Sequence, residues 1–341
     1  MPKTTNAGRV RPPTMADVAA LAGVSPQTVS RVLRDHPNVS EVTRLQVENA
    51  VESTGYRRTG LARALVTGRS MTIGVLTHES DQYAASSIML GIHRAARARG
   101  YFVSSAGTTS VSAAAIAGGI GRLRDQGVDA LVIAVPIWDE PALAKAVHGI
   151  PTAVIDADTS AADVVVDLDQ EAAGRLATQH LIDLGHETVW HIAGPANWKD
   201  ASGRTQGWAA ALAEAGKTAP PVLNGDWTPA SGYQLGLVLG RVADATAVFV
   251  SSDEMAIGVI HALRELGRDV PGDISVVAMD DIPVAQYVSP PLTTVRQPFE
   301  RMGELAVERV IAELDGAGDE QRNAHIAPEL IVRGSTAPPA R

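Results

Sequence analysis

Polar side chains follow three apolar, strand-like runs of the sequence at the point where each run ends. Asp156 ends the run TAVID, Ser252 follows TAVFVS, and Asp280 follows ISVVAM. The ends of parallel strands meet in one cleft, to which we expect Arg204, in the segment GRTQGW, to add a guanidinium. Carboxylates and a guanidinium make paired hydrogen bonds to vicinal hydroxyls, so the pattern indicates a sugar site. An Asp after a strand also commonly caps a helix, which is the role expected for Asp253.

A second set of residues suits contact with DNA and lies in the segment PQTVSRVL, residues 26–33. Polar side chains occupy the outer face of the predicted helix: Gln27, Thr28, Ser30 and Arg31. Apolar side chains occupy the inner face: Val29, Val32 and Leu33. Gln and Arg make bidentate contacts to base edges in the major groove, and hydroxyls reach phosphates. The segment therefore favours a recognition helix, and a three-helix bundle with an ordinary polar face is the alternative.

Helix start and stop signals surround this segment and predict three short helices over residues 15–22, 26–33 and 41–54. Hydroxyl residues precede the helices and glycines follow the first and third of them. These signals are Thr14 with Asp17, Ser25 with Pro26, and Ser40 at the starts, and Gly23 and Gly55 at the ends. The regular spacing predicts a helix-turn-helix unit.

Enzymatic chemistry finds little support in the sequence. Asp280 and Asp281 are adjacent, so at an extended strand end they point apart, unlike the facing carboxylates of a glycosidase. The GGIG at residues 118–121 lies within or beside a helical stretch, which excludes a dinucleotide fingerprint. The nine His are scattered, with no H-x-x-x-H spacing. We therefore assign no catalytic residue, no metal site and no cofactor.

Charge is divided unevenly along the chain. Residues 1–70 hold 10 Lys and Arg against 5 Asp and Glu, although the 341-residue chain has a net charge of −9. The basic N-terminal region suits nucleic acid, and the acidic remainder should be repelled by it.

Several absences bear on location and class. The chain has no Cys, which excludes disulfides and fits a reducing cytoplasm. It shows no apolar run of membrane-spanning length and no signal-peptide pattern, so we expect a cytoplasmic protein without a membrane partner. The same absences argue against a secreted sugar-binding protein that does not bind DNA. Residues 1–13 are polar and contain Pro, and we expect them to be disordered.

From residue 71 onward, apolar runs alternate with amphipathic stretches, as in an α/β fold. The expected strands cover residues 72–76, 101–105, 130–135, 152–156, 164–167, 188–194, 246–251, 274–279 and 325–333. The expected helices cover residues 84–99, 169–184, 203–215, 229–242 and 253–266. Runs that are apolar throughout indicate parallel strands covered on both faces. These strands are too many for one sheet, so we predict two doubly wound, Rossmann-like subdomains with a cleft between them.

The most characteristic runs are DVAALAGVSPQTVSRVL and LARALVTGRS near the N-terminus, and GRTQGW, SSDEMAIG and PPLTTVRQPF further on. They resemble the lactose/galactose repressor (LacI/GalR) family of bacterial transcription regulators, and the resemblance covers nearly the whole chain. It implies a helix-turn-helix DNA-binding domain and a periplasmic-binding-protein-like core. The implied order is a disordered arm at 1–13, the DNA-binding domain at 14–58, a hinge helix at 59–70, the core N-subdomain at 71–168 and 299–326, and the core C-subdomain at 169–298 and 327–341. The chain would cross between subdomains near Leu168, Val295 to Pro298, and Ile326.

The resemblance also assigns contacts to DNA. Pro26, Gln27 and Arg31 would read base edges. Phosphate contacts fall on Thr14, Ser25, Thr28, Ser30, Asn38 and Thr43. In the family the hinge helix folds only on operator DNA and inserts a leucine into the minor groove, and Leu65 matches that wedge. The alternative for residues 57–70 is a solvated linker with one buried leucine.

For the effector site, the resemblance implies a set of ligand contacts in the cleft: Asp156, Arg204, Trp227, Ser252, Asp280 and Phe299. His78 joins them from the wall of the N-subdomain, with a solvent-facing loop position as the alternative. Trp198 would close the cleft as a lid or pack its own loop. The chain departs from the family pattern in two places. Ser252 stands where an asparagine reaches the sugar, and Pro26 stands where a tyrosine reads bases, so effector and operator are expected to differ.

The expected function is that of a homodimeric repressor on a palindromic operator, released when a small sugar or glycoside, galactosides included, binds between the subdomains. A purine-type corepressor, with the opposite sign, is the alternative within the family. A purine needs two aromatics that sandwich its ring, and 3 Phe, 5 Tyr and 5 Trp offer few candidates. The heptad helix that follows the core in tetrameric members has no counterpart here, so we expect a dimer.

Overall fold

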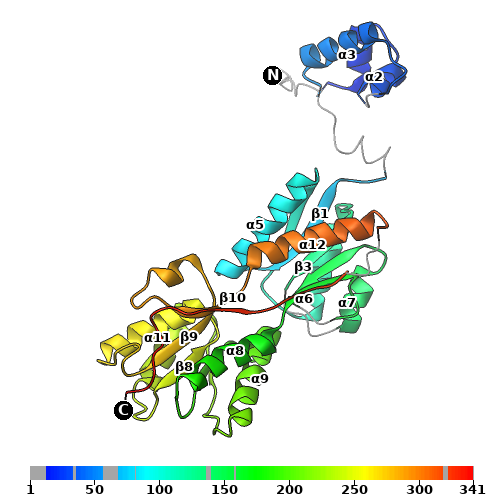
Figure 1. Ribbon diagram of the computed structural model, residues 1–341. Coiled ribbons are helices and arrows are strands. Elements are labelled where there is room, and N and C mark those ends of the chain that lie inside the picture. Colours follow the sequence, from blue (N-terminus) through cyan, green and yellow to red (C-terminus); the bar gives the residue numbers. More distant parts are fainter. Residues whose placement is uncertain are drawn as a thin grey trace, which may run out of the picture. The chain divides into compact units, whose positions relative to one another are not determined.

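The structure is a computed structural model that describes residues 13–33, 36–56, 68–80, 82–135, 140–156, 159–317 and 322–340. It contains two compact units, residues 1–70 and 71–341 (Figure 1). Two predictions fall outside the described residues: the arm before Pro13, and the segment of the hinge helix that contains Leu65.

The first unit is a bundle of three helices. They are α1 (Met15–Ala22), α2 (Pro26–Val32) and α3 (Glu41–Thr54). Each helix contributes a valine that is 0% exposed to a common core: Val18, Val29 and Val47. Leu33, which was expected on the inner face of the second helix, is half-buried and caps that helix. A small core of this kind fixes the helices at their crossing and leaves their outer faces to solvent.

The capping signals of the sequence operate in the structure. The Thr14 amide donates to Asp17 Oδ2 (2.7 Å) and the Asp17 amide donates to Thr14 Oγ1 (3.4 Å), which forms a capping box at α1. Gly23 follows this helix with a φ of 66°, the left-handed conformation that lets the chain turn at once into α2. The helix-turn-helix geometry therefore follows from local sequence.

The second unit contains two six-stranded sheets, each with its own helices. The N-subdomain is built on the sheet with strand order β11-β5-β4-β3-β1-β2, in which all neighbours are parallel. Its strands are β1 (Thr72–His78), β2 (Phe102–Thr108), β3 (Ala130–Ala134), β4 (Thr152–Ile155), β5 (Val164–Leu168) and β11 (Ala324–Ile326). Its helices are α5 (Tyr83–Ala98), α6 (Ala113–Asp125), α7 (Glu140–Val147) and α12 (Phe299–Leu314). In Figure 1, α5 and α12 lie side by side over one face of the sheet, and α6 and α7 over the other.

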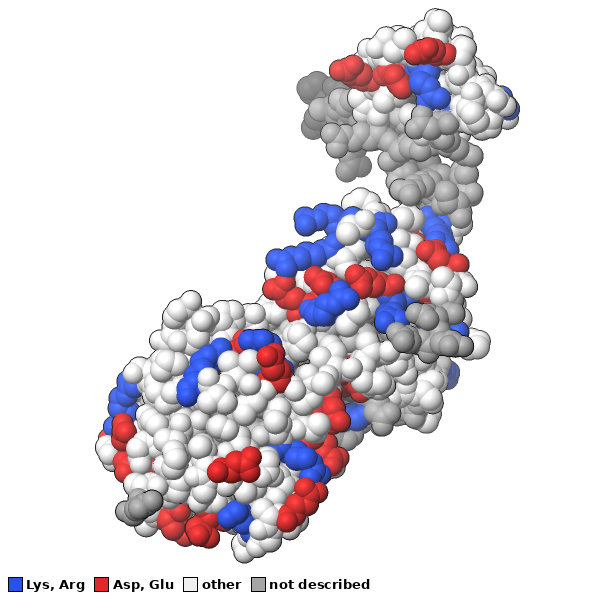
Figure 2. All heavy atoms as spheres, in the orientation of Figure 1, with Lys and Arg blue, Asp and Glu red and all other residues white. Residues whose placement is uncertain are grey.

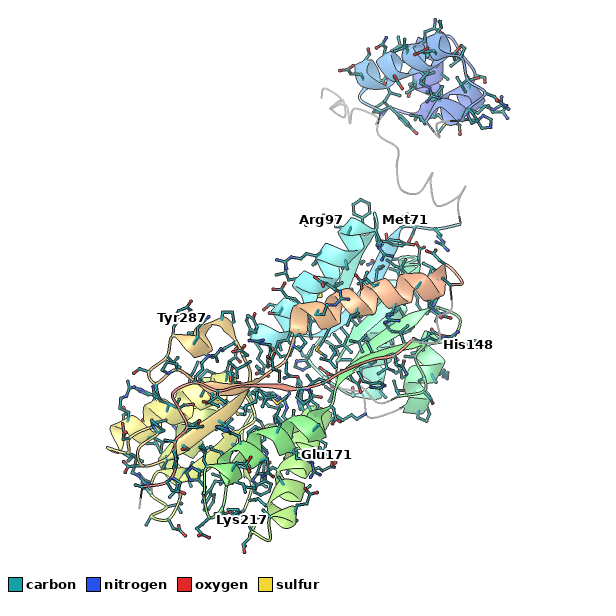
Figure 3. The ribbon with its side chains drawn as sticks, in the orientation of Figure 1. Met71, Arg97, His148, Glu171, Lys217 and Tyr287 are labelled. Atoms are coloured by element: carbon teal, nitrogen blue, oxygen red, sulfur yellow. The ribbon has the colours of Figure 1, made fainter. Side chains whose placement is uncertain are left out.

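The C-subdomain is built on the sheet with strand order β12-β10-β9-β8-β6-β7. Its strands are β6 (Trp190–Ala193), β7 (Leu223–Asn224), β8 (Ala247–Val250), β9 (Ser275–Asp280), β10 (Thr293–Arg296) and β12 (Glu329–Ile331). Its helices are α8 (Gln170–Asp183), α9 (Lys199–Glu214), α10 (Pro229–Leu239), α11 (Asp253–Glu265) and the 3₁₀ turn η1 (Pro283–Gln286). In Figure 3, Arg97 and His148 mark the N-subdomain, and Glu171, Lys217 and Tyr287 mark the C-subdomain.

Two expectations about the strands were wrong. β12 runs antiparallel to β10, so the C-subdomain sheet is mixed and not wholly parallel. The single strand expected over residues 325–333 is two strands, β11 and β12, which belong to different sheets. Pro328 lies between them and has no amide to donate to a strand ladder, so the run is interrupted there. β7 and β10 were not expected, because residues 223–224 and 293–296 are short runs without a clear pattern.

The chain passes between the two sheets three times, after β5, after β10 and after β11. The three connecting segments therefore converge beside the carboxyl ends of the strands. Among the described residues, no helix combines the length and apolar character needed to cross a membrane.

Candidate functional site

The exposed face of α2 brings together the residues assigned to base reading. Ser25 starts the helix by accepting a hydrogen bond from the Thr28 amide (3.1 Å), and Pro26 occupies its first position. Pro26, Gln27 and Arg31 are exposed, whereas Val29 and Val32 are buried beneath them. The helix thus presents an amide and a guanidinium to solvent on a rigid support, which is the arrangement that major-groove readout requires.

Most of the residues assigned to phosphate contacts also have a local structural role. The Thr14 hydroxyl bonds to Asp17, the Ser25 and Thr28 hydroxyls bond to each other (2.9 Å), and the Thr43 hydroxyl bonds to Ser40 (2.8 Å). Ser30 is half-buried on α2, and Asn38 is exposed in the loop before α3. Helix N-termini and their capping hydroxyls are favourable places for a phosphate, so the two roles are compatible.

In the core, two adjoining pockets lie between the subdomains. The first, which we call the N-pocket, has a volume of about 640 Å³, and the second, the C-pocket, about 430 Å³. Four residues line both: Gln82, Ala84, Trp198 and Asp200. The N-pocket contains His78 and Asp156. The C-pocket contains the other predicted ligand contacts, Arg204, Trp227, Ser252, Asp280 and Phe299. The structure therefore brings all seven residues to one cleft.

Arg204 is held at the floor of the cleft by a close approach of two helices. A Cβ on Gly174 of α8 would lie 2.2 Å from the Arg204 carbonyl oxygen, so only glycine permits this packing. The Arg204 side chain is 4% exposed. Its Nε donates to Gln170 Oε1 (2.8 Å) and its Nη1 donates to the Ser251 carbonyl oxygen, which fixes the guanidinium in place.

Asp280 stands at the end of β9 in a strained backbone. Its φ is 120° and that of Asp281 is 58°, both in the left-handed region that favours glycine. Asp280 Oδ1 accepts a hydrogen bond from Gln297 Nε2 (2.6 Å). Asp281 turns to the other side, where it accepts from Arg296 Nε (2.9 Å) and Arg333 Nη2 (2.6 Å). The adjacent carboxyls therefore have separate roles, one in the cleft and one at the connecting segments.

The expectation that Asp253 caps a helix was wrong. The N-cap of α11 is Ser252, whose Oγ accepts from the Met255 amide (3.2 Å). Asp253 is fully buried and accepts from the Ile282 amide (2.8 Å) and from Thr294 Oγ1 (2.6 Å). It thereby holds the loop that follows Asp280. The sequence predicts a cap from spacing alone. The observed hydrogen bonds of Asp253 instead join it to partners that lie 29 and 41 positions further along the chain.

Burial raises the pKa of the carboxyls in the cleft. It raises the pKa of Asp280 to about 7, opposed by Arg204 and by the hydrogen bond from Gln297. Burial, then repulsion by Asp200, raises the pKa of Asp156 well above its ordinary value. The pKa of Asp200 is also raised, because the effect of burial exceeds the opposing effect of Arg204. Of the described residues that line the two pockets, Arg204 alone is an Arg or Lys. The cleft is therefore rich in hydrogen-bond acceptors.

The outer surface of the core shows a different distribution of charge. In Figure 2, acidic and basic side chains alternate over α5 and α12. Arg94 pairs there with Glu300, and Arg301 pairs with Glu304 (3.1 Å) and Glu308 (3.3 Å). Exposed pairs of this kind contribute little to stability. Carboxyls outnumber cations in the cleft, whereas on this face both signs are interspersed.

Aromatic rings line the cleft on both sides. Trp227 is 7% exposed and lies against Gly194, where a Cβ would come within 2.1 Å of its ring. The Arg204 guanidinium carbon lies 5.4 Å from the centre of the Trp227 ring. Trp198 meets Trp227 edge to face (5.8 Å between ring centres) and also meets His78 (5.5 Å). Phe299 and Tyr83 make a further edge-to-face pair (6.2 Å).

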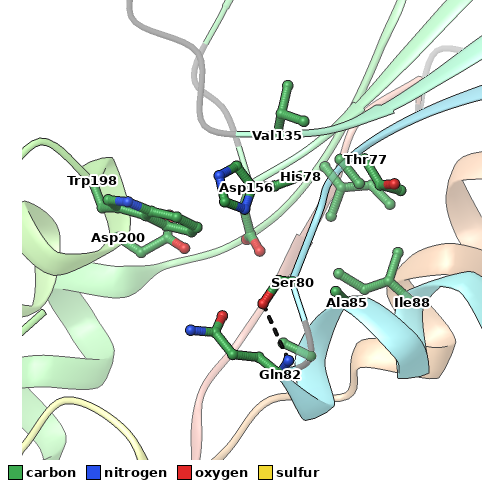
Figure 4. A pocket seen from close by; sticks show the side chains of 13 residues that line it. Thr77, His78, Ser80, Gln82, Ala85, Ile88, Val135, Asp156, Trp198 and Asp200 are labelled. Atoms are coloured by element: carbon green, nitrogen blue, oxygen red, sulfur yellow. Dashed lines mark hydrogen bonds between the residues drawn. The ribbon is translucent and has the colours of Figure 1, made fainter. Parts of the chain in front are cut away.

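Figure 4 shows how the N-pocket is assembled. His78 and Asp156 project into it between Trp198 and Asp200 on one side and the α5 residue Ile88 on the other. His78 is the last residue of β1, is half-buried and lines the N-pocket, so it lies on the cleft wall and not in a solvent-facing loop. Trp198 lies between the two pockets and touches rings in both, so it does more than pack its own loop.

Sequence reasoning missed other cleft residues: Gln82, Tyr83, Asp200, Glu254 and Gln297. Asp200 precedes Arg204 by four positions on α9, a spacing that places both on one helix face and was available in the sequence. Gln297 follows β10, a strand that was not recognised. Among the described residues, no group of three or more His, Cys, Asp and Glu is arranged to hold a metal ion.

Comparisons with known proteins identify both parts of the chain. Residues 14–59 match the model of bacterial regulatory proteins of the lacI family, and residues 178–336 match that of the periplasmic binding protein-like domain. The transcriptional regulator CelR of Thermobifida fusca is 35% identical over 346 residues, which cover 96% of this chain and 99% of CelR.

Solved structures extend the likeness to the fold. The lac repressor dimer bound to operator and the anti-inducer ONPF has a TM-score of 0.90 and 31% identity, covering 96% of this chain and 100% of that one. The complex of CelR with cellobiose has a TM-score of 0.69 and 32% identity, covering 95% and 99%. The chain therefore belongs to the lacI family of bacterial regulatory proteins and is a DNA-binding transcriptional regulator.

Proposed function

We propose that this chain is a repressor that leaves a palindromic operator when a small sugar or glycoside binds in the cleft. The observation that carries the proposal is the composition of the two adjoining pockets. Asp156, Asp200 and Asp280 offer oxygens to ring hydroxyls, and Arg204 offers a fixed set of donors. Trp227 and Phe299 supply apolar surface for the C–H face of a pyranose.

The division of the cleft favours a ligand with two moieties. The C-pocket holds the guanidinium and the indole of Trp227, which suits a sugar ring. The N-pocket adds Ile88, Ala85 and Val135 beside Asp156 and suits a second sugar or an apolar aglycone. Because Trp198 and Asp200 line both pockets, one disaccharide or glycoside can contact both. CelR is known with cellobiose bound, and galactosides remain candidates alongside glucosides.

A purine corepressor is the second candidate within the family, and the geometry of the rings disfavours it. A flat base is held best between two parallel rings. Trp198 and Trp227 instead meet at 73°, and Tyr83 and Phe299 meet at 67°. Neither pair can therefore hold a base between two parallel faces.

At the DNA, we propose that Gln27 and Arg31 read base edges from the exposed side of α2, with Pro26 against a neighbouring base. Thr14, Ser25, Thr28, Ser30, Asn38 and Thr43 would hold the phosphates on either side. Two such helices on a homodimer would meet half-sites about one helical turn apart. The lac repressor of similar fold is a dimer on its operator, which supports this arrangement.

From the family pattern alone, we propose that Leu65 inserts into the minor groove of the operator and kinks the duplex. Replacing Leu65 by Ala should reduce the kink in a bound operator, because a methyl group is too short to separate adjacent base pairs. Energy transfer between dyes at the two ends of the duplex measures the bend. Undiminished bending in this variant would contradict the wedge.

The effector assignment is tested by a screen with two readouts. Ribose, galactose, lactose, cellobiose, hypoxanthine and guanine are compared for their effect on the melting temperature of the chain. Each is then added to the chain bound to a duplex that it has selected from random sequence. We expect a disaccharide to raise the melting temperature and to release the duplex. A purine that strengthens DNA binding, with no response to any sugar, would overturn the proposal.

A further inference from the structure

Two glutamines connect the cation of the cleft to one of its carboxyls through an unbroken chain of hydrogen bonds. Arg204 Nε donates to Gln170 Oε1 (2.8 Å), Gln170 Nε2 donates to Gln297 Oε1 (3.1 Å), and Gln297 Nε2 donates to Asp280 Oδ1 (2.6 Å). Gln297 is 5% exposed, so water competes little for its amide. Neither glutamine belongs to the ligand contacts assigned above.

The direction of this chain is set by its ends. A guanidinium has donors only, so Gln170 must turn its oxygen toward Arg204 and its NH₂ group away. Gln297 must then accept with its oxygen and donate with its own NH₂ group. The last acceptor is Asp280, whose ionised carboxylate accepts from any donor. If Gln170 is lost, Gln297 Oε1 loses its donor and Arg204 Nε loses its acceptor, so both side chains are held less firmly.

The two glutamines also lie on two different connections between the subdomains. Gln170 begins α8 directly after the first passage, at β5, and Gln297 follows β10 at the second. The hydrogen bond between Gln170 and Gln297 therefore joins the first connecting segment to the second. When subdomains rotate, connecting residues absorb the change in backbone angles, so a bond between two connecting segments is subject to that change.

We propose that Gln170 and Gln297 are positioning residues that hold Arg204 and Asp280 in one arrangement and make it depend on the angle between the subdomains. The proposal rests on the cleft as the effector site. A ligand bound to Arg204 and Asp280 would then affect the connecting segments through these two glutamines. Asp281 supports the same link, because it bonds to Arg296 on β10 and to Arg333 after β12.

The titration of Asp280 reports on the chain of hydrogen bonds without any ligand. The charged groups near this carboxyl are Arg204 and Asp200 on α9, Asp253 and Glu254 at the start of α11, and the adjacent Asp281. The hydrogen bond from Gln297 lowers the pKa of Asp280, because it favours the ionised form. Losing that donor should therefore raise the pKa.

The first experiment measures this titration by ¹³C NMR of the Asp carboxyls in the full-length protein, assigned with Asp280→Asn. No hydrogen bond joins Gln170 to Asp280, so Gln170→Leu should act on Asp280 through the two side chains that Gln170 holds, Gln297 and Arg204. We expect the midpoint of Asp280 to rise in Gln170→Leu and to stay unchanged in Gln206→Leu, a matched control on the exposed side of α9. Equal midpoints in the two variants would overturn the proposal.

The second experiment uses Gln297→Glu, which keeps the shape of the side chain but loses its NH₂ donor. Above the midpoint of the new carboxyl pair no proton lies between the introduced carboxylate and Asp280, whereas below it one shared proton restores a donor. With cellobiose as the probe, we expect binding about tenfold weaker than in the unaltered chain near pH 8, and within about threefold near pH 5.5. Gln206→Glu should show neither change.

No loss at either pH value would mean that Gln297 acts through its shape alone. A loss of equal size at both pH values would mean that the shared proton does not replace the lost donor, and either result would overturn the proposal. If the unaltered chain does not bind cellobiose, the choice of sugar fails. The NMR titration still decides the role of the glutamines, so the two failures are distinguishable.

Discussion

In the helical unit the residues assigned to base reading stand exposed on one short helix, whereas in the core the residues assigned to the effector are buried or half-buried and come from separate segments. Gln27 and Arg31 lie one turn apart on α2. Arg204, Asp280 and Asp156 belong to a helix and two strand ends that are distant in sequence. No charged side chain is buried among the described residues of the helical unit, whereas Arg204 and Asp253 are buried in the core.

This difference has a physical consequence. A side chain on a solvated face is desolvated only when it binds its target, so it has no desolvation cost on folding and contributes little to stability. A buried carboxyl or guanidinium is stable only with its partners, and its pKa is shifted. Changes at the DNA surface should therefore affect binding alone, whereas changes in the cleft should affect binding, stability and pH dependence together.

The largest effect is expected for Arg204→Ala. The change removes the one guanidinium that faces the cleft carboxyls, so sugar affinity should fall about a hundredfold, or about 3 kcal/mol. Calorimetric titration of the best sugar from the screen measures this loss. Operator affinity in the absence of sugar should remain, and Arg301→Ala on the outer face of the core serves as control. A variant that still releases the operator normally with sugar would remove Arg204 from the site.

The second prediction concerns pH. Because the pKa of Asp280 is raised to about 7, the folded core keeps a proton that the unfolded chain releases above its ordinary value of 3.8. Stability should therefore fall as pH rises from about 4 to about 7, and then level off. Asp156, Asp200 and Asp253 act in the same direction.

Asp280→Asn should flatten this dependence by about 3 kcal/mol between pH 4 and pH 7. Urea unfolding of the core at a series of pH values measures it, and the exposed Asp244→Asn is the matched control. Carboxylates with lowered pKa values would instead make the core more stable as the pH rises from 4 to 7. Such a gain in stability would contradict the raised pKa values of the cleft carboxyls.

Arg31→Ala should have a smaller effect that is confined to DNA. The loss of one bidentate base contact weakens specific binding by roughly tenfold, or about 1.4 kcal/mol, and leaves non-specific binding nearly intact. Fluorescence anisotropy on a selected duplex and on a scrambled one separates the two. Equal losses on both duplexes would reassign Arg31 to a phosphate.

The smallest change is expected for Ser40→Ala, which removes the N-cap of α3. The Thr43 amide would lose its acceptor, and the helical unit should lose about 1 kcal/mol of stability. Thermal melting of the helical signal, with the sugar response of the core as internal control, measures the loss. If the unfolding of the core moved with it, the two units would not be independent.

The same contrast explains what the sequence could predict. The three helices follow from local signals, because Thr14, Ser25, Ser40 and the glycines at 23 and 55 each act within a few residues. The α/β class and the two sheets follow from the apolar runs. The sequence also predicted that polar residues at the strand ends meet in one cleft, and Asp156, Ser252 and Asp280 do line it.

The remaining features depend on contacts between distant residues. Asp253 has the spacing of a helix cap, but its carboxyl bonds to Ile282 and Thr294. The antiparallel edge strand β12 depends on where the chain returns to the second sheet after Pro328. The link from Gln170 to Gln297 spans 127 positions. No periodicity or local motif carries such information, because these pairs meet only in the folded core.

In the proposed function, a sugar bound in the cleft controls the affinity of the helical unit for DNA. The most direct test is a titration of the best sugar into the chain bound to its selected duplex, followed by anisotropy, for the unaltered chain and for Arg204→Ala. We predict release from the unaltered chain and no release from Arg204→Ala, with equal affinity for the duplex before sugar is added. Release of both proteins at the same sugar concentration would contradict the account.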